Sequence, residues 1–443
     1  MNGLLTDLYE LTMSAGYFEA DKSEERATFE LSIRKLPPNR NFVIAAGLAQ
    51  AVEYLLAVGF AGEDIDYLRT LPQFSRVSKA FFERLRAFRF TGDLFAAPEG
   101  TPIFSGEPIL TVRAPLIEAQ VVETYLLATI GYQSLVTTKA ARIVETARGR
   151  GVIEFGTRRA HSPEAGLLAA RAAYIGGCLG TSNTLAGRRF GIPVYGTAAH
   201  SWVLAFPNET EAFAQLQKLL GEAATYVVDT YDSLEGTRRA AALGKPLWGI
   251  RLDSGDLLEL SRATRLILDE AGLTEAHIMA SGDLDEYKIR RLVEAGAPID
   301  AFGVGTELVT SADAPVLPVV YKLVELETRT GRKYTAKFSE EKVTLPGAKQ
   351  IYRFADYDEI TCAWECRQYE PEAQAPQAIL QPVLVNGQLV AELPDAASAR
   401  SYAAKAISRL PESCRRLVDP EAYPIRYSDQ LLALAEQARK SAY

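Results

Sequence analysis

Arginine, aspartate and glycine residues recur at the ends of short apolar runs in the middle of this chain. They lie in six segments: residues 155–161, 195–201, 229–232, 251–256, 281–283 and 303–306. Arginine forks bind carboxylate or phosphate groups, and glycine lets backbone N–H groups approach an anion closely. Aspartates suit hydroxyl groups or a magnesium ion. The combination predicts a pocket for an anionic small molecule.

Each of these residues also has a structural explanation when it is taken alone. Glycine after a strand most often makes a turn, and a strand-end aspartate such as Asp256 is more often a helix N-cap than a catalytic group. Arg158 and Arg159 could be a solvated pair, and His161 and His277 fit structural or surface roles. The functional hypothesis therefore depends on all six segments occurring together.

The histidines and cysteines do not predict a metal site built by the protein. The three histidines are scattered, and only His200, which follows a glycine-threonine turn, has a functional case. Cys362, Cys366 and Cys414 would make an incomplete zinc set. We expect them to be ordinary buried thiols.

Seven apolar runs alternate with helical stretches in the same part of the chain. They are residues 151–155, 177–180, 192–195, 226–228, 248–252, 277–280 and 299–304. Such short runs are typical of parallel strands that are covered by helices. No Rossmann glycine fingerprint follows the first run, which favours an incomplete or irregular (β/α) barrel over the alternative, a doubly wound sheet. The C-terminal strand ends of a barrel form one rim, so the polar segments should meet there.

The stretch after residue 280 shows how a strand end would lead into a helix. Asp283 stands three residues before Glu286, as in a capping box. Ile289 and Val293 lie on one apolar stripe, and Gly296 would end the helix. The pattern predicts a helix that begins directly after the segment 281–283.

The two flanks of the chain have a different pattern. Residues 28–33 alternate as a strand, and strand character returns at residues 318–324 and 349–354. We expect a second α/β domain formed from the N- and C-terminal flanks. The predicted divisions are residues 1–115, residues 116–312 for the barrel with most of the active site, and residues 313–443 for the return to the flanking domain and a helical C-terminal part.

Charge and hydropathy exclude some classes of protein. The formal net charge is −8 over 443 residues, which argues against a broad basic surface for nucleic acid. No apolar run reaches the roughly 18 residues of a membrane span, and the first residues lack the features of a signal peptide. We expect a cytoplasmic protein with no nucleic-acid or membrane partner.

Six motifs in order resemble those of the nicotinate phosphoribosyltransferases, and the resemblance covers most of the chain. They are residues 5–13 (LTDLYELTM), 155–161 (FGTRRAH), 196–201 (GTAAHS), 250–256 (IRLDSGD), 281–285 (SGDLD) and 302–306 (FGVGT). The resemblance implies a type II phosphoribosyltransferase, in which an α/β barrel is paired with a domain made from both termini. It also implies a homodimer with active sites shared between subunits.

The resemblance implies a reaction as well. Nicotinate and phosphoribosyl pyrophosphate would give nicotinate mononucleotide and pyrophosphate in NAD synthesis, coupled to ATP hydrolysis and assisted by Mg²⁺. His200 corresponds to the histidine that ATP phosphorylates in this family, and neutral imidazole is a suitable nucleophile.

Four residues correspond to contacts with the pyridine substrate. The resemblance implies that Tyr9 reaches in from the partner subunit to stack on the ring, with Phe155 on the opposite face. Thr197 and Arg251 correspond to nicotinate contacts, and Arg251 would bind the carboxylate through two hydrogen bonds.

Other positions correspond to contacts with the phosphorylated sugar. The phosphoribosyl site is implied for Gly282, Gly303, Gly305 and Thr306. Arg34 and Arg158 would be further phosphate contacts, while Asp253 and Asp283 would hold ribose hydroxyls or magnesium. A second phosphate-contacting region aligns loosely with Lys337, Ser339, Lys342 and Lys349.

Three alternative functions remain open at this point. A nicotinamide-specific phosphoribosyltransferase would share the aromatic stack and the histidine. A barrel aldolase would need a Schiff-base lysine at a strand end, and no such lysine stands out. A non-catalytic ligand-binding relative is the third alternative, against which the intact His200, Arg251 and Asp253 argue.

Overall fold

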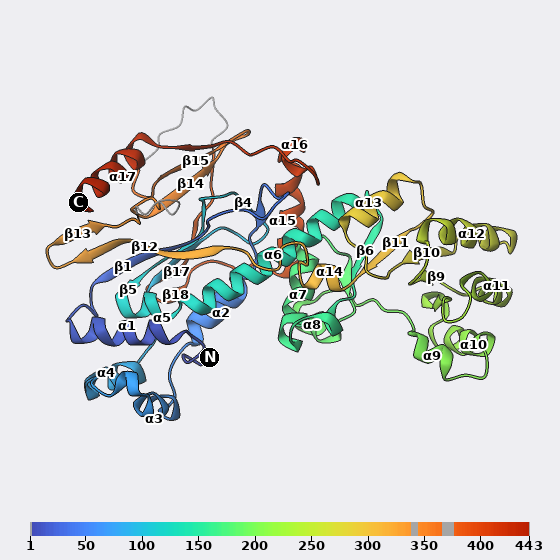
Figure 1. Cartoon of the computed structure of the whole chain (residues 1–443), viewed down its shortest axis with the longest axis horizontal. Helices are drawn as coiled ribbons and strands as arrows, with labels where there is room; N and C mark the ends of the chain where they lie inside the picture. Colours follow the sequence, from blue (N-terminus) through green and yellow to red (C-terminus); the bar gives the residue numbers. More distant parts are fainter. Residues whose placement is uncertain (1, 338–343, 366–375, 443) are drawn as a thin grey trace. The chain divides into compact units, whose positions relative to one another are not determined.

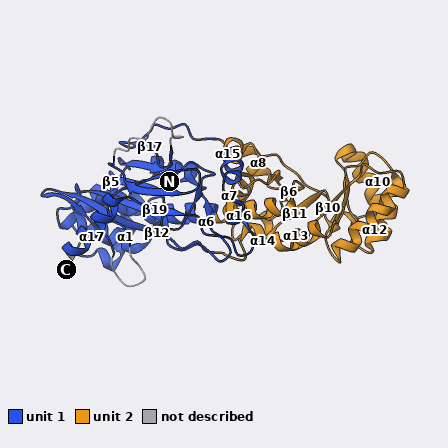
Figure 2. Ribbon diagram, turned by 90° about the horizontal axis from the view of Figure 1, so that it is seen from above, with its two compact units in different colours: residues 1–134, 316–394, 402–443 blue, residues 135–315, 395–401 orange. Residues whose placement is uncertain are grey.

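The computed structural model describes residues 2–337, 344–365 and 376–442 (Figure 1). Two compact units divide the chain (Figure 2). The barrel unit contains residues 135–315 and 395–401, and the flank unit contains residues 1–134, 316–394 and 402–443. Two helices, α6 (Glu123–Ala147) and α15 (Ala396–Ser408), carry residues of both units.

A parallel sheet of six strands forms the centre of the barrel unit. Its strands are, in sheet order, β7 (Gly180–Thr181), β6 (Gly151–Glu154), β11 (Ala301–Val304), β10 (His277–Ala280), β9 (Gly249–Leu252) and β8 (Thr225–Val227). All neighbouring strands are paired in parallel. Their C-terminal ends therefore lie at one edge of the sheet, as the sequence predicts.

Helices follow the strands of this sheet, as Figure 1 shows for α12 and α13. The helices are α7 (Pro163–Ile175), α8 (Thr184–Phe190), α9 (His200–Leu204), α10 (Glu209–Leu220), α11 (Ser233–Leu243), α12 (Leu257–Glu270), α13 (Glu286–Glu294) and α14 (Thr306–Val309), with 3-10 turns at Thr157–Arg159 and Gly221–Ala223. Side chains cap several of them: Asp256 accepts hydrogen bonds from the first turn of α12, which satisfies backbone groups that lack partners within the helix.

The sheet is an incomplete barrel because β7 and β8 stand at its two edges. The third predicted run, residues 192–195, makes only an isolated bridge between Val194 and Thr181. Pro193 has no N–H to donate to a ladder, and Val194 and Tyr195 are exposed. The run at 177–180 is also displaced, because Gly177 has a positive φ and the strand begins at Gly180.

Helix α13 begins as predicted, but with a different cap. Asp285 is the N-cap and accepts a hydrogen bond from the Lys288 amide, so the capping box expected for Asp283 is wrong. Asp283 instead has a φ of 45°, which asparagine and aspartate tolerate better than most residues. Gly296 follows the helix with a φ of 69°, as expected for the residue after a C-cap.

The flank unit contains an antiparallel sheet made from both ends of the chain. Its strands are, in sheet order, β13 (Gly331–Tyr334), β12 (Val319–Thr328), β1 (Arg26–Ile33), β5 (Pro108–Pro115), β3 (Asp93–Ala96), β17 (Gln381–Val385) and β18 (Gln388–Leu389). The N-terminal strand β1 pairs with β12 on one side and β5 on the other. The second domain is therefore formed from both flanks, as the sequence predicts.

Two smaller sheets and a set of helices complete the flank unit. The sheets are β16 (Gln377–Ala378), β14 (Lys349–Arg353), β15 (Asp358–Cys362) and β19 (Ile425–Tyr427), and the pair β2 (Val43–Ile44) and β4 (Pro102–Ile103). The helices are α1 (Leu8–Glu19), α2 (Leu48–Ala57), α3 (Gly62–Thr70), α4 (Lys79–Arg86), α5 (Leu116–Val121), α16 (Glu412–Arg415) and α17 (Asp429–Ala442), with a 3-10 turn at Pro72–Phe74.

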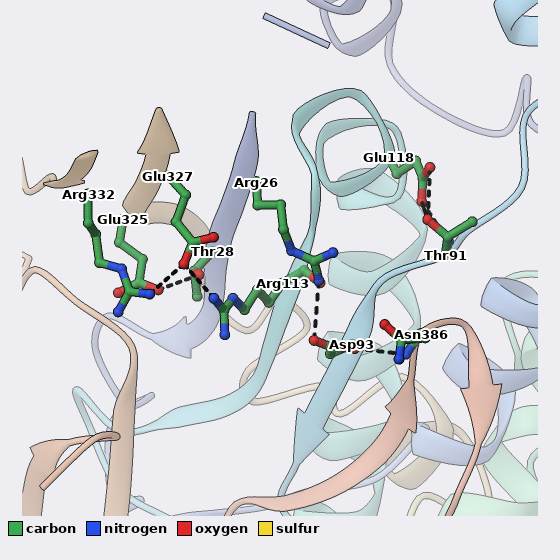
Figure 3. A network of polar contacts seen from close by, with 10 residues as sticks. All are labelled: Arg26, Thr28, Thr91, Asp93, Arg113, Glu118, Glu325, Glu327, Arg332 and Asn386. Atoms are coloured by element: carbon green, nitrogen blue, oxygen red, sulfur yellow. Dashed lines mark hydrogen bonds and ion pairs between the residues drawn. The ribbon is translucent and has the colours of Figure 1, made fainter. Parts of the chain in front are cut away.

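Polar contacts join strands that are far apart in the sequence (Figure 3). Glu327 on β12 pairs with Arg113 on β5 and with Arg332 on β13. Arg26 on β1 lies 3.3 Å from Asp93 on β3. Because these partly exposed pairs are screened by water, each adds little stability. The pair Arg113–Glu327 connects the N- and C-terminal flanks of the chain within the sheet.

Candidate active site

Arg251 on β9 is the centre of a polar cluster in the barrel unit. Its Nε donates to Ser281 Oγ at 2.8 Å and its Nη1 to Thr197 Oγ1 at 2.9 Å. Its Nη2 donates to Asp253 Oδ1 at 2.6 Å. Parallel pairing explains the arrangement, because β8, β9 and β10 run side by side and end at the same edge.

An aromatic ring lies beside this guanidinium. Arg251 Cζ is 5.7 Å from the centre of the Phe155 ring, which follows β6. The ring packs on Gly303 of β11, where an added Cβ would lie 2.6 Å from a ring carbon. Only glycine leaves this space, so β11 allows Phe155 to face the cluster.

Asp253 is held as a carboxylate by its neighbours. Burial raises the pKa of this carboxyl, but hydrogen bonds from Ser281 and Arg251 and the charge of Arg251 lower it further, so the net pKa is below its usual value. Gly282 packs against the Asp253 carbonyl: with a φ of 95°, its added Cβ would lie 2.1 Å from that oxygen. Asp253 is therefore charged at neutral pH.

His200, at the start of α9, faces two carboxylates. Its Nε2 lies 3.7 Å from Asp253 Oδ2 and 4.0 Å from Asp229 Oδ1, while its Nδ1 is 3.2 Å from Thr230 Oγ1. The Asp229 side chain is buried and accepts hydrogen bonds through Oδ2 from Ser254 Oγ and the Asp253 amide. Its other oxygen, Oδ1, has no hydrogen-bond partner within the described chain.

The remaining predicted residues of this unit surround the cluster less closely. Gly305 lies against the Phe155 carbonyl, where an added Cβ would be 3.3 Å away, and Thr306 begins α14 directly after it. Arg158 and Asp283 are exposed. Neither of their side chains contacts Arg251, Asp253 or His200 in the part of the chain that the structure describes.

Tyr9 and Arg34 belong to the flank unit. Tyr9 lies on α1, and its side chain is partly exposed. The pKa of its hydroxyl is raised, first by burial and then by the charge of Glu123, to which it is hydrogen-bonded. Arg34 follows β1 and lines a cavity of about 150 Å³ together with Lys322 and Lys349. Lys349 is buried and paired with Glu30 at 2.7 Å.

Sequence reasoning missed three residues of the cluster as individual contributors. Asp229, Thr230 and Ser281 lie in strand-end segments that the sequence singles out, yet their roles come from partners 24 to 30 positions away. Their position directly after β8 and β10 was the only available signal.

Cysteines and metal-type clusters do not provide a second site. Cys178, Cys362 and Cys414 are free and buried, whereas Cys366, like Ser339 and Lys342, lies outside the described residues. No group of three or more histidine, cysteine, aspartate or glutamate residues suited to a metal ion occurs among the residues described. Among these residues, no helix has the length and apolar character of a membrane span.

Three family models cover most of the chain. The nicotinate phosphoribosyltransferase N-terminal domain matches residues 4–131 and the C-terminal domain of the same family matches residues 354–435. Between them, the C-terminal domain of quinolinate phosphoribosyl transferase matches residues 136–316. The fold and its strand-end cluster are thus of the phosphoribosyltransferase class.

Relatives over the whole length identify the family within this class. The chain is 45% identical over 440 residues to the nicotinate phosphoribosyltransferase pncB2 of Mycobacterium tuberculosis, covering 98% of this chain and 93% of that protein. It is 39% identical to the nicotinate phosphoribosyltransferase of Bacillus subtilis, covering 96% and 93%. The chain belongs to the nicotinate phosphoribosyltransferase family of enzymes.

A solved structure agrees with this assignment. The crystal structure of human nicotinic acid phosphoribosyltransferase matches with a TM-score of 0.84 and 30% sequence identity, covering 98% of this chain and 99% of that one. The α/β fold with an incomplete barrel and a second domain from both flanks is therefore shared with a member of the family.

Proposed function

We propose that this enzyme joins nicotinate to phosphoribosyl pyrophosphate, giving nicotinate mononucleotide and pyrophosphate for NAD synthesis. The observation that carries the proposal is the Arg251 guanidinium beside the Phe155 ring. Arginine has five N–H donors, and three of its nitrogens each donate once within the cluster. The two remaining N–H groups suit the carboxylate of a flat ring that lies against Phe155.

The same geometry favours nicotinate over nicotinamide. A carboxylate accepts from every N–H that Arg251 offers, whereas the NH₂ of an amide would meet donors with another donor. Thr197 Oγ1, which accepts from Arg251, fixes the guanidinium in this orientation. Nicotinamide is the alternative substrate that must be tested.

The transfer itself needs little acid–base chemistry. The pyridine nitrogen attacks C1 of the ribose while the C1–O bond to pyrophosphate breaks, and positive charge develops on the sugar. Asp253 is charged and would hold the ribose hydroxyls near that centre. Backbone N–H groups near Gly282, Gly303, Gly305 and Thr306, with Arg158, would bind the phosphates.

The residues present fit a magnesium ion that is shared with the substrate. Asp229 Oδ1 is a buried carboxylate oxygen that lacks a hydrogen-bond partner among the described residues. It lies 4.0 Å from His200 Nε2, and Asp253 Oδ2 lies 3.7 Å from the same nitrogen. Mg²⁺ prefers such oxygens and is commonly held by one or two carboxylates together with substrate phosphates. When bound, it would offset the charge of the leaving diphosphate. Asp283, exposed beside Gly282, is a third carboxylate for this role.

ATP would act through His200. The imidazole has 41% of its side chain exposed and its Nδ1 is positioned by Thr230. A ring nitrogen would attack the γ-phosphorus of ATP and release ADP, and water would later cleave the P–N bond to return free histidine and phosphate. The charge added in between would change how this pocket holds the diphosphate substrate.

The active site would be completed by a second subunit. Tyr9 and Arg34 belong to the flank unit, and in a homodimer the partner's flank unit would supply the aromatic face and a cationic cavity. The exposed side chains of Leu5, Leu8 and Met13 around Tyr9 support a surface that a partner covers.

A product assay tests the proposal. Nicotinate, nicotinamide and quinolinate are each incubated with phosphoribosyl pyrophosphate and Mg²⁺, with and without ATP. Mononucleotide and pyrophosphate should form from nicotinate, with a gain from ATP. Preference for nicotinamide would overturn the substrate assignment, and tight binding of the sugar diphosphate without product would favour a non-catalytic relative.

A further inference from the structure

A buried ion network in the barrel unit has no residue in common with the strand-end cluster. Lys139 on α6 has only 1% of its side chain exposed, and its Nζ lies 2.6 Å from Glu286 Oε2 and 2.8 Å from Asp313 Oδ1. Glu286 is fully buried and also pairs with Arg142 Nε at 3.0 Å. The printed ion pairs thus join Lys139 and Arg142 to Glu286, and Lys139 to Asp313.

Such a network is not explained by stability alone. Removing charged groups from water costs several kcal/mol per ion, and apolar residues of similar volume often stabilise a core as well or better. A buried network fixes geometry instead, because each charge accepts only a narrow set of partner positions. Lys139 bridges Glu286 and Asp313 through one ammonium group.

Both anions stand next to the loops that would bind phosphate. Glu286 is the first residue of α13, four positions after Gly282. Asp313 follows α14, which begins at Thr306. One ammonium group on a third element, α6, thus ties the segment after β10 to the segment after β11.

These loops contain backbone conformations that need support. Gly282 and Asp283 have φ values of 95° and 45°, and Ser311, buried two residues before Asp313, has a φ of 45°. Non-glycine residues with positive φ persist where surrounding contacts hold them. The Lys139 network makes its contacts close by in the sequence, at Glu286 and at Asp313.

We propose that Lys139 is a positioning residue for the phosphate-binding loops: through Glu286 and Asp313 it holds the backbone N–H groups near Gly282 and Thr306 at the spacing that a sugar diphosphate requires. This inference rests on the proposed function. Lys139 does not bind the phosphates itself, since its ammonium is buried and occupied by two carboxylates.

Two variants and one control test the proposal. Asp313→Asn removes one arm of the network at a side chain that is 28% exposed, so the fold should survive. Lys139→Met removes the centre at similar volume. Arg148→Ala is the control, since Arg148 lies on the surface beside α6 and pairs with Glu294 at the end of α13 at 3.5 Å.

Binding and kinetics are measured for each protein together with its thermal midpoint. Asp313→Asn should raise KM and Kd for phosphoribosyl pyrophosphate about tenfold or more, because small displacements of binding groups are costly, while KM for nicotinate stays within about twofold. Hydrogen exchange at residues 282–285 and 305–308 should become faster. Arg148→Ala should change none of these values.

The outcomes separate this inference from the proposed function. Wild-type protein that fails to bind phosphoribosyl pyrophosphate would reject the function. Wild-type binding with unchanged affinity and exchange in folded Asp313→Asn would reject the positioning role, even if the thermal midpoint fell. Should Lys139→Met fail to fold, the result for Asp313→Asn decides.

Discussion

At the scale of single residues, the three hydrogen bonds of Arg251 make a direct prediction about substrate binding. Arg251→Ala should raise KM for nicotinate by about 100-fold, close to 3 kcal/mol, because a charged pair with two hydrogen bonds is lost. KM for phosphoribosyl pyrophosphate should change far less. Steady-state kinetics with each substrate varied in turn measure both values.

Two further variants interpret that result. Arg251→Lys keeps the charge but loses the fork, so its defect should remain large. Arg238→Ala removes an exposed arginine whose side chain lies 3.5 Å from Glu235, and it should behave as wild type. Equal increases in both KM values for Arg251→Ala would mean that Arg251 is not the nicotinate contact.

His200 is the residue through which ATP hydrolysis would be coupled to product formation. His200→Ala should abolish ATP hydrolysis coupled to product formation while leaving some transfer at high substrate concentration, since the ring that would accept phosphate is gone. ADP and mononucleotide are measured in the same reaction. Thr230→Val, which removes only the hydrogen-bond partner of Nδ1, should give a milder defect. ATP hydrolysis that persists unchanged in His200→Ala would refute the phosphohistidine.

At this scale, the sequence predicted which side chains would lie together, while their roles stay predictions. Residue type and strand-end position suggested Arg251, Asp253 and His200, which lie together in the structure. Asp229 was not singled out because its feature is a buried oxygen that has no hydrogen-bond partner among the described residues, which is a property of the packed state. Such properties have no pattern in the sequence.

At the scale of elements, Gly282 joins β10 to α13 by a turn that only glycine makes well. Gly282→Ala would combine a φ of 95° with a Cβ 2.1 Å from the Asp253 carbonyl, so the loop must move. We expect KM for phosphoribosyl pyrophosphate to rise at least about tenfold. Kinetics and thermal unfolding measured together show whether the effect is on binding.

The matched control is at the other end of α13. Gly296 has a φ of 69°, and a Cβ added there would meet open space. Gly296→Ala should therefore cost about 1 kcal/mol of stability without a change in KM for phosphoribosyl pyrophosphate. Normal affinity in Gly282→Ala would show that this turn does not place a phosphate contact.

Helix α1 of the flank unit carries a buried acid with a measurable pH effect. Burial, together with Glu123 and Asp7, raises the pKa of Glu10 to about 8, against hydrogen bonds from Thr124 that lower it. Between pH 4.5 and 8 the folded protein keeps a proton that the unfolded chain loses. Stability should therefore fall as pH rises through this range and level off above it.

Glu10→Gln should remove this dependence, because the amide stays neutral at every pH. At pH 9 the free energy of unfolding of Glu10→Gln should exceed that of wild type by on the order of 3 kcal/mol, so its thermal midpoint should be higher. Near pH 4.5 the two midpoints should approach each other. Glu83→Gln, an exposed position on α4, is the control. Parallel pH curves for wild type and Glu10→Gln would contradict the raised pKa.

Elements were predicted well where the hydrophobic periodicity is strong. They were predicted poorly where hydrogen bonding between strands determines whether a run becomes a strand. The runs at residues 248–252 and 277–280 contain strands as expected, at Gly249–Leu252 and His277–Ala280. The run at 192–195 has strand composition, but Pro193 limits its hydrogen bonding and it makes one bridge. The cap of α13 moved from Asp283 to Asp285 because two aspartates compete there, and backbone geometry selects between them.

At the scale of the whole molecule, the flank unit shows how distant segments depend on one another. Strand β1 lies between β5 and β12, whose residues are up to 301 positions away from it in the register Arg26 to Glu327. Alternating patterns predict each strand, but they do not name the partner. The flank pattern and the family resemblance both predicted a domain made from the two ends of the chain, but neither predicted which strands pair.

Mixed dimers can show whether Tyr9 of one chain completes the active site of the other chain. The Tyr9→Ala and Arg251→Ala proteins should each have low activity at low nicotinate concentration. If the partner subunit supplies Tyr9, the two proteins should complement each other when they are unfolded and refolded together. Half of the dimers would be mixed, and each would have one intact site, so activity should recover to about a quarter of wild type. Two tagged forms purified in sequence isolate the mixed dimers. If Tyr9 and Arg251 acted within one chain, every site in the mixture would carry a defect and activity would stay low.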